Sequence, residues 1–441
     1  MALSTLPYKG SRDFYPEAKR LQKYIFNKFR EAVERFGYEE YDAPILESQE
    51  LYLAKTSEEI VNEQTYSFID RGGRKVVIRP EMTPTISRMV AAKRQELVYP
   101  LRWYSIPNLW RYERPQHGRL REHWQLNVDL FGIESITAEQ EIISIADAIF
   151  KKFGAKSDMF TIKLNSRKFM LFVLRDYLGL DEVQVSSMSR LIDHIQKLDH
   201  TDFITQADAL CRQSQRAEGT VEKLLDVLAA KRFTALPLAL QNHPAITELQ
   251  LLIDLLSEAG IPNTEFDVSL MRGFDYYTDI VFEIYDNHPE NNRAIMGGGR
   301  YDGLVGLFGV EPIPTIGFGL GDVTLANFLE IHDLLPNLPI ETDLYAVLVG
   351  DVLPKAQKVI SEFRTNGLNV AVDLSGRKID KQLTTASKKG IPYALIIGNQ
   401  ELESEHYTLR NMQAGSEEKH SIARIVSIIK DYRNPKKVLE A

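Results

Sequence analysis

Hydrophobic residues recur every three or four positions near the start of the chain and predict an amphipathic helix over residues 17–36. Gly37 follows, where a helix commonly ends. Residues 38–46 then alternate between polar and apolar and predict a strand, in which Pro44 suits an edge, a strand end or a bulge. Further strands are expected at residues 76–78, 101–106 and 125–131, and a helix is expected at residues 138–150.

The middle of the chain has a different pattern. Residues from about 167 to 260 are dominated by helical periodicity and contain few β-branched clusters. We therefore expect a helical insertion, with helices at residues 169–178, 187–198, 220–230 and 246–259. Strand patterns return at residues 266–271 and 280–284, and a glycine-rich strand is expected at residues 314–321.

The last part of the chain predicts a separate domain. Residues 331–341 contain Pro336 and Pro339 and are typical of a linker. Strands and helices alternate over residues 342–432, which favours a small α/β domain. The expected organisation is a first domain over residues 1–330 with its insertion, the linker, the α/β domain, and a tail at residues 433–441.

Composition and charge narrow the class of protein. A chain of 441 residues is long enough for two or three domains. It has 53 Lys and Arg against 61 Asp and Glu, a net charge of −8, which excludes a uniformly basic nucleic-acid-coating protein but leaves room for a local basic site. Cys211 stands alone, so an internal disulfide framework is excluded. We expect a cytoplasmic protein, because no targeting segment and no membrane-spanning run are visible.

The densest charged segment is residues 111–121, which holds four arginines and one glutamate around Pro115 and Gly118. Arginine suits phosphate recognition because its planar group donates two parallel hydrogen bonds and keeps its charge. A solvated charged hairpin is the alternative reading. The flanks favour a binding role, because residues 101–106 are apolar enough for a core strand.

The strand expected after this segment alternates cleanly. Gln125, Asn127 and Asp129 should project from one face, while the residues between them pack on the other. A hairpin of this kind can hold a polyphosphate at its tip and a cationic small molecule at its base.

These residues resemble a known family. Residues 111–116 with Gln125 and Asp129 resemble motif 2 of the class II aminoacyl-tRNA synthetases, in the histidyl-tRNA synthetase version. Residues 270–278 and 298–305 resemble the two histidine-specific signatures of that family, and residues 79–83 resemble its Arg-Pro-Glu-x-Thr loop. The first helix and strand resemble motif 1. Four blocks in the family's chain order make the resemblance strong.

The resemblance implies a fold and an activity. The fold is an α+β catalytic domain with an antiparallel six-stranded sheet and flanking helices, a helical insertion, and a C-terminal α/β anticodon-binding domain. The activity is a histidine–tRNA ligase that activates histidine with ATP and transfers it to the 3′ end of histidine tRNA. Mg²⁺ accompanies ATP, and the protein is expected to be a homodimer with no membrane or DNA partner.

The resemblance also assigns roles to individual residues of this chain. Arg111 and Arg272 are the expected catalytic cations. The expected histidine-binding residues are Glu81, Met82, Thr83, Arg111, Gln125, Asp129, Arg272, Tyr276, Tyr277 and Tyr301. The expected ATP-binding residues are Arg111, Glu113, Arg119, Arg121 and His123. Glu113 is the expected magnesium ligand, and Gln116 would lie near the tRNA acceptor end.

The chain departs from the family pattern at three positions. Thr324 occupies the place of the motif 3 arginine that contacts the γ-phosphate of ATP, so another cation must serve that phosphate or ATP binds less tightly. His123 stands where a phenylalanine usually stacks on adenine, and Asp129 stands where many relatives have glutamate.

A non-catalytic regulatory subunit or a tRNA-sensing protein is the alternative function. The altered motif 3 favours this alternative. The presence of residues 342–432 and of residues 272–277 opposes it.

Within residues 342–432, a local positive run is expected to contact tRNA phosphates, at Arg377, Lys378, Lys381, Lys388 and Lys389.

Overall fold

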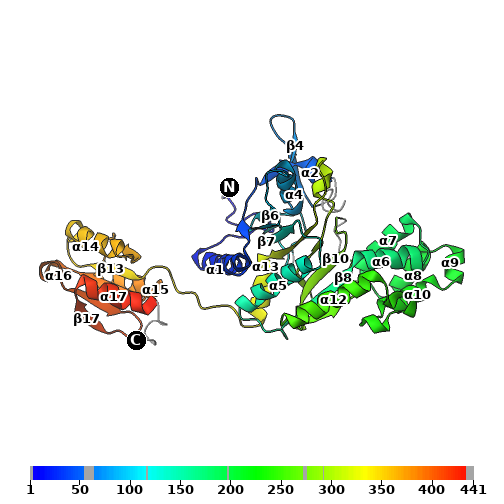
Figure 1. The fold of residues 1–441 in the computed structure, drawn as a ribbon. Coiled ribbons are helices and arrows are strands. Elements are labelled where there is room, and N and C mark those ends of the chain that lie inside the picture. Colours follow the sequence, from blue (N-terminus) through cyan, green and yellow to red (C-terminus); the bar gives the residue numbers. More distant parts are fainter. Residues whose placement is uncertain are drawn as a thin grey trace. The chain divides into compact units, whose positions relative to one another are not determined.

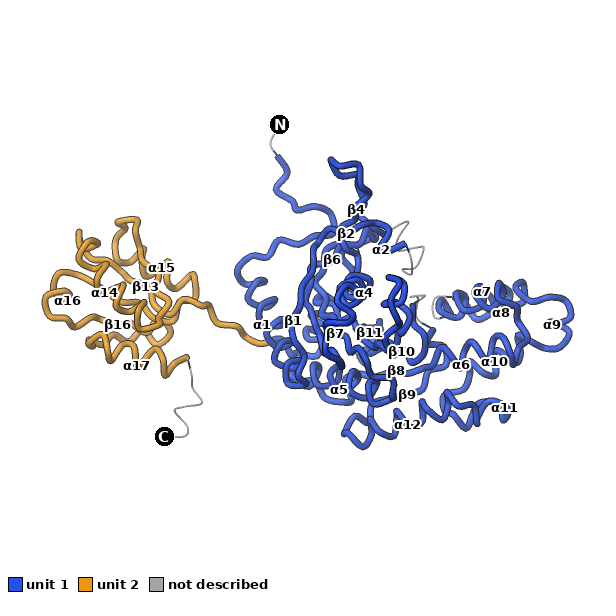
Figure 2. The backbone as a smooth tube through the Cα atoms, turned by 45° about the horizontal axis from the view of Figure 1, so that its top comes forward, with its two compact units in different colours: residues 1–335 blue, residues 336–441 orange. Residues whose placement is uncertain are grey.

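The structure is a computed structural model that describes residues 3–53, 64–115, 118–195, 198–271, 276–291 and 293–433. The chain divides into two compact units, Met1–Leu335 and Pro336–Ala441 (Figure 2). Each unit has a hydrophobic core of its own.

The first unit is built on a nine-stranded sheet whose central strands are antiparallel (Figure 1). The central order is β5 (Leu101–Ser105), β7 (Glu122–Phe131), β12 (Thr315–Gly321), β11 (Ala294–Arg300), β10 (Ile280–Asp286) and β8 (Phe160–Ser166). β1 (Glu39–Glu40) and β9 (Thr264–Phe266) add short parallel edges, and β6 (Asn108–Trp110) pairs with the first half of β7. The predicted six-stranded antiparallel sheet is therefore confirmed, with an extra parallel strand at each edge.

Helices cover the sheet because each carries an apolar stripe at helical spacing. α1 (Pro16–Val33) buries Ile25, Phe29 and Val33, which are three or four residues apart. α1 packs against α5 (Thr137–Lys152), and α5 in turn packs on β7 and β12. α13 (Asp322–Ile331) follows β12 directly and packs on the same strands. The main core lies between these helices and the sheet.

Residues 167–258 are largely helical, as the periodicity predicts, although the boundaries differ from the expected ones. The helices are α6 (Arg167–Phe172), α7 (Glu182–Asp193), α8 (His200–Leu210), α9 (Gln213–Ala217), α10 (Thr220–Leu228), α11 (Leu238–Gln241) and α12 (Pro244–Glu258). α7 begins earlier than expected because Asp181 and Gln184 form a reciprocal cap at its start. α8 was not predicted. α12 extends back to pack on β8 and β9 of the sheet.

The single strand predicted over residues 38–46 is wrong. The structure has two short strands there, β1 in the main sheet and β2 (Leu46–Ser48) in a separate sheet with β4 (Lys75–Ile78) and β3 (Tyr66–Ile69). Between them, the Arg79 guanidinium donates to the Ala43 carbonyl at 2.6 Å and to the Asp42 carboxylate at 3.2 Å. Pro44 has no N–H to donate to a ladder, so the chain leaves the main sheet at this point.

The strand predicted over residues 266–271 ends early, at Phe266. The next residue, Asp267, folds back on the chain: its carboxylate accepts hydrogen bonds from the backbone N–H and the hydroxyl of Ser269. A local turn of this kind competes with strand pairing.

Arg300 is the last residue of β11 and forms a buried ion pair. Its guanidinium donates to both oxygens of Glu139 on α5, at 2.5 and 2.7 Å, and to the Ile133 carbonyl at 3.1 Å. Both side chains are at most 5 % exposed. The arginine of the second signature block therefore joins the sheet to a helix.

Replacing Arg300 by alanine is expected to lower the free energy of unfolding by about 3 kcal/mol, because Glu139 would be left charged and buried. Urea unfolding followed by far-ultraviolet circular dichroism measures this change. The variant Arg102→Ala, whose ion pair with Glu141 is about 30 % exposed, is a control that should cost far less. Equal losses in the two variants would contradict the structural role of Arg300.

The second unit is a five-stranded sheet with helices. β14 (Val370–Val372), β13 (Leu344–Leu348) and β15 (Tyr393–Ile397) are parallel, and β16 (Tyr407–Asn411) and β17 (Glu417–His420) continue the sheet in antiparallel order. The helices are α14 (Leu353–Thr365), α15 (Ile379–Lys388), α16 (Asn399–Ser404) and α17 (Ile422–Arg433). The predicted α/β architecture is confirmed.

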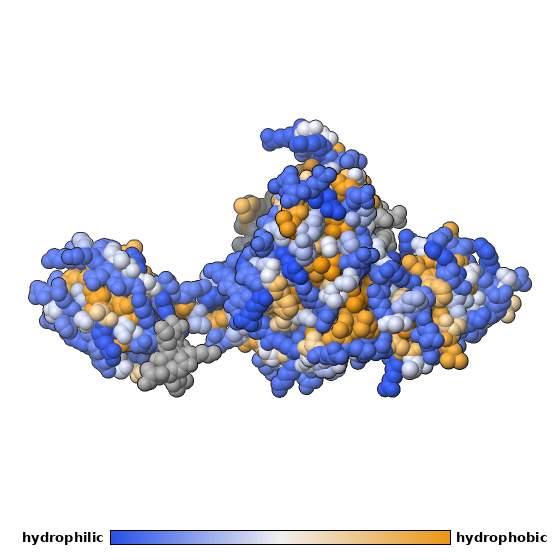
Figure 3. All heavy atoms as spheres, viewed as in Figure 1, coloured by the Kyte–Doolittle hydropathy of each residue, from blue (hydrophilic) through white to orange (hydrophobic). Residues whose placement is uncertain are grey.

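Hydrophilic side chains cover most of the face seen in Figure 3, with hydrophobic residues gathered in patches between them. Over the described ranges, every helix is too short or too polar to cross a membrane.

Candidate active site

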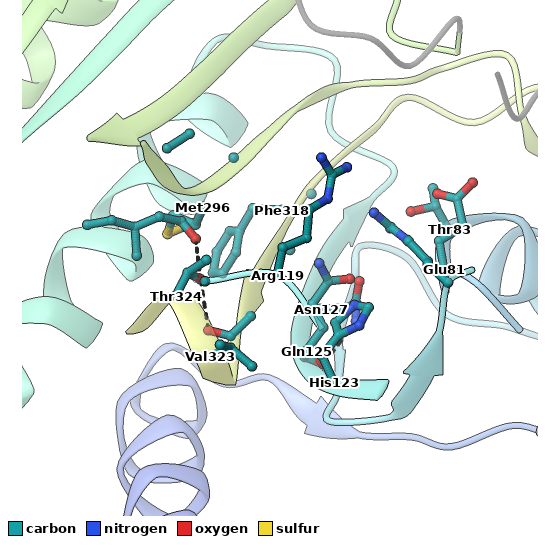
Figure 4. A pocket seen from close by; sticks show the side chains of 18 of the residues that line it. Glu81, Thr83, Arg119, His123, Gln125, Asn127, Met296, Phe318, Val323 and Thr324 are labelled. Carbon is teal, nitrogen blue, oxygen red and sulfur yellow. Dashed lines mark hydrogen bonds between the residues drawn. The ribbon is translucent and has the colours of Figure 1, made fainter. Parts of the chain in front are cut away.

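A cavity of about 330 Å³ opens where β7, β11 and β12 meet the start of α13. Figure 4 shows Glu81 and Thr83 on one side and Val323 and Thr324 on the other. The polar side chains that line the cavity come from separate parts of the sequence: Glu81, Thr83, Arg111, Glu113, Arg119, His123, Gln125, Asn127, Asp129, Tyr276, Tyr277, Tyr301 and Thr324.

The floor is the polar face of β7. Gln125, Asn127 and Asp129 line the cavity, while the intervening residues of the strand are buried in the core. The neighbouring strand β12 passes close to these side chains because it carries glycine. A Cβ atom at Gly317 would lie 2.3 Å from the Asp129 carboxylate. The glycine-rich sequence of β12 is thus what leaves room for Asp129 in the cavity.

One end of the cavity combines two carboxylates with tyrosines. The hydroxyl of Tyr276 donates to Glu81 at 3.2 Å, and the hydroxyl of Tyr301 donates to Asp129. The ring centroids of Tyr276 and Tyr277 lie 4.9 Å apart, and those of Tyr276 and Tyr301 lie 5.7 Å apart. This end offers hydrogen-bond acceptors for a cation beside a wall of aromatic rings.

The other end is cationic. The Nε of Arg111 donates to the Pro80 carbonyl at 2.9 Å, which anchors its guanidinium at the cavity. Arg119 forms an ion pair with Glu113. Burial, together with the charges of Arg111, Arg12 and Arg119, lowers the pKa of His123 to about 3. The imidazole is therefore neutral at neutral pH and can stack on a flat ring without adding charge.

Two of the expected residues do not line the cavity. Met82 is completely buried in the core, just before α4 (Thr83–Ala92). Arg121 points away: its Nε donates to the Glu113 carbonyl at 3.0 Å, and its guanidinium carbon lies 3.9 Å from the ring centroid of Tyr112. The expected roles of Arg272 and Gln116 fall on residues outside the described ranges.

Thr324 brings no charge to the cavity, and its hydroxyl is bonded to backbone carbonyls. Its hydroxyl donates to the Ile295 carbonyl at 2.8 Å and contacts the Gly321 carbonyl at 3.1 Å. Val323 beside it and Phe318 on β12 also line this wall. Nothing in the sequence marks Phe318 as a lining residue, because an apolar residue between glycines is equally typical of a buried strand.

Asn127 also lines the cavity, although the family resemblance assigns it no role. Its side-chain amide donates to the Gln125 carbonyl at 3.1 Å, and it lies 6 % exposed. The alternation of the strand had placed Asn127 on the polar face, and that was the signal that could have identified it.

Burial raises the pKa of Asp129 to about 7, although the hydrogen bond from Tyr301 opposes the rise. A cationic ligand favours the charged carboxylate, so affinity for an ammonium ligand should fall about fivefold as the pH drops from 7 to 6. In the free protein, the folded state favours the protonated form of Asp129. Its contribution to the free energy of unfolding is therefore complete below pH 4 and is lost as the pH rises through about 7.

The variant Asp129→Asn should therefore bind an amino acid weakly at every pH and melt at a higher temperature than the unchanged protein at pH 8. Calorimetric titration and thermal melts between pH 6 and 8 measure both effects. Because the Asn side chain does not titrate, the pH dependence that remains in this variant measures the titration of the ligand itself. An unchanged pH dependence in Asp129→Asn would contradict the assignment.

The second unit carries basic residues just before α15, in its first turn and at its end. Asp373 pairs with Arg377 at 2.6 Å. Burial raises the pKa of Asp373, but hydrogen bonds from Ser375 and Arg377 outweigh this and lower it to about 2. The expected lysines at 378, 381, 388 and 389 are exposed. Arg377 is thus partly neutralised, and the lysines carry the positive charge of this surface.

Comparisons with known proteins match both units. The family model described as histidyl-tRNA synthetase matches residues 10–323, and the model described as anticodon binding domain matches residues 339–432. The chain is 42 % identical to the histidine–tRNA ligase of Leptospira biflexa, over 97 % of this chain and 98 % of the relative.

Two solved structures share the fold. The histidyl-tRNA synthetase from Nostoc has a TM-score of 0.80 at 23 % identity and covers 98 % of this chain and 100 % of its own. The apo histidyl-tRNA synthetase of S. aureus has a TM-score of 0.71 at 26 % identity and covers 97 % of this chain and 100 % of its own. With sequence and fold in agreement over nearly the whole length, this chain belongs to the histidyl-tRNA synthetase family.

Proposed function

We infer that this protein is a histidine–tRNA ligase, which activates histidine with ATP and transfers the histidyl group to the 3′ end of histidine tRNA. The observation that carries this inference is the cavity itself: one end holds two carboxylates, each bonded to a tyrosine, and the other holds arginines and a neutral histidine. These ends suit the two reactants, an amino acid and a nucleotide, and bring them together.

Activation joins two anions. The histidine carboxylate oxygen attacks the α-phosphorus of ATP, the bond to the bridging oxygen breaks, and pyrophosphate leaves. Negative charge spreads over the phosphoryl oxygens in the transition state, so fixed cations lower the barrier. Arg111 is anchored by Pro80 at the cavity and is the proposed cation for the α-phosphate. The family resemblance assigns Arg272 to the opposite side.

The histidine substrate fits the acidic end. Glu81 and Asp129 would accept hydrogen bonds from the α-ammonium or from an imidazole N–H, and Tyr276 and Tyr301 already donate to those carboxylates. A site built from such groups rejects apolar amino acids, because its buried polar groups would lose their partners. Gln125 and Thr83 would complete the polar contacts.

ATP fits the cationic end. The neutral ring of His123 would stack on adenine, and Arg119 would turn from Glu113 to a phosphate. The described residues include no group of three or more His, Cys, Asp or Glu arranged to hold a metal ion. That is compatible with Mg²⁺, which is usually held by one or two carboxylates and the substrate phosphates. Glu113 is the proposed protein ligand, and the ion would supply charge neutralisation to the phosphates.

Histidine tRNA would be held by both units, with its acceptor end at the cavity and its anticodon on the second unit. We also propose a homodimer working in the cytoplasm. Sedimentation equilibrium tests the dimer, and a mass equal to one chain at micromolar concentration would contradict it.

A regulatory or tRNA-sensing protein is the second candidate, and Thr324 in place of a cation is the observation that favours it. The deciding experiment is histidine-dependent exchange between ATP and labelled pyrophosphate, with the other amino acids as controls. Exchange with histidine alone supports the ligase. Binding of tRNA by a folded protein that shows no exchange would support the second candidate.

A further inference from the structure

The segment of residues 8–14, here called the strap, runs ahead of α1 and lies against the start of β7. The Gly10 carbonyl accepts hydrogen bonds from the backbone N–H groups of Arg121, at 2.9 Å, and Glu122, at 3.1 Å. Gly10 has a φ of +87°, and a Cβ atom there would lie 2.8 Å from the Arg121 side chain. Only glycine fits this contact without strain.

Arg12 of the strap reaches a second element. Its guanidinium donates to Asp322, the first residue of α13, at 2.7 Å, although the two residues are 310 positions apart. The other oxygen of Asp322 accepts the backbone N–H of Trp124 at 3.0 Å. Phe14 packs edge-on against the Trp124 ring at 5.2 Å, and the Arg12 guanidinium lies over the Phe14 ring at 4.9 Å. One buried carboxylate therefore joins the strap, β7 and α13.

Each of these contacts borders a residue that lines the cavity. Trp124 stands between His123 and Gln125, and Asp322 immediately precedes Val323 and Thr324. The strap thus contacts both β7 and the start of α13 beside residues that line the cavity. The charge of Arg12 also reaches the cavity, because it contributes, after burial and the charge of Arg111, to the lowered pKa of His123.

We propose that the strap is a positioning element for ATP: Arg12, acting through Asp322, fixes the wall formed by the start of α13, where Thr324 contributes no positive charge. This rests on the proposed function for the identity of the nucleotide. Arg12 is a positioning residue, since it touches the wall and not the reacting atoms. The acidic end, with Glu81, lies apart from these contacts and should not depend on them.

The test compares Arg12→Ala, Arg12→Lys, Asp322→Asn and the double variant Arg12→Ala with Asp322→Asn, all in the full chain. ATP binding is measured by calorimetry, and KM for ATP and for histidine are measured by pyrophosphate exchange. Arg12→Ala should weaken ATP binding and raise KM for ATP about tenfold, because a charged hydrogen bond at a buried carboxylate is lost. KM for histidine should change less than twofold. Arg12→Lys should restore part of the loss.

The double variant should be no worse than Arg12→Ala alone, because both single changes remove the same ion pair. Lys19→Ala is the matched control: its ammonium also lies over the Phe14 ring, at 5.7 Å, but donates to Gln22 and not to Asp322. It should behave as the unchanged protein does.

Unchanged ATP binding in Arg12→Ala would overturn the proposal. So would equal rises in KM for ATP and histidine together with a lower melting temperature, which would indicate general destabilisation. If the unchanged protein binds ATP without exchange, the proposed ligase function fails, while the effect of Arg12→Ala on ATP binding still decides the role of the strap.

Discussion

Replacing Arg111 by alanine is expected to lower histidine-dependent pyrophosphate exchange about 1,000-fold, because removing one fixed donor to a developing anion costs that order of magnitude in comparable sites. Arg111 lines the cationic end of the cavity, and the Pro80 carbonyl fixes its direction through a hydrogen bond of 2.9 Å. The guanidinium is therefore oriented before the reactants arrive, and its loss cannot be replaced by a mobile side chain nearby.

The effect should lie mainly in kcat, because the charge on the phosphoryl oxygens grows in the transition state. Arg111→Lys keeps the charge but loses the planar pair of donors, so it should recover only part of the rate. Arg114→Ala is the control, since Arg114 is an exposed arginine of the same segment that does not line the cavity. A variant Arg111→Ala that exchanges at more than a tenth of the normal rate would contradict the assignment.

Deleting residues 336–441 is expected to leave histidine-dependent exchange within a few-fold of normal and to lower the charging of histidine tRNA by a factor of about 100 to 10,000. The deleted unit has its own core and its own sheet, and every described residue that lines the cavity lies in the first unit. Two modules that bind one tRNA gain avidity of this size from being linked, and the deletion removes that gain.

Pyrophosphate exchange and tRNA charging, measured on the same preparation, separate these effects. A charge-reversal variant of the intact chain, Lys378→Glu with Lys381→Glu, gives an independent check, because both lysines are exposed on the second unit. It should weaken charging in a salt-dependent way and spare exchange. Equal loss of exchange and charging in the deletion variant would instead assign the second unit a structural role.

Local hydrophobic periodicity was sufficient to predict the helices and strands that bury one face. The spacing of Ile25, Phe29 and Val33 predicted α1, and the alternation of Gln125, Asn127 and Asp129 predicted the polar face of β7 that lines the cavity. These predictions succeed because the period of a helix or a strand is written in neighbouring residues. The family resemblance then supplied the fold class and the activity, because its motifs are ordered blocks of sequence.

Contacts between segments that are distant in the sequence could not be predicted from the local pattern of residues. Nothing in the sequence around Arg300 indicates that it pairs with Glu139, 161 residues earlier, or that Arg121 turns to Tyr112 and away from the cavity. The strand predicted over residues 38–46 is interrupted where the Ala43 carbonyl accepts a hydrogen bond from Arg79, 36 residues later, a contact that the local pattern does not indicate.

The sequence by itself therefore determined the amphipathic elements, the family and the chemical types of the side chains available for binding. The tertiary structure decided which of those side chains share one cavity, how burial raises the pKa of Asp129 against the hydrogen bond from Tyr301, and how Arg12 reaches Asp322 across 310 residues. The physical reason is range: hydrophobic period is a property of adjacent residues, whereas burial and ion pairing depend on which distant segments the sheet brings together.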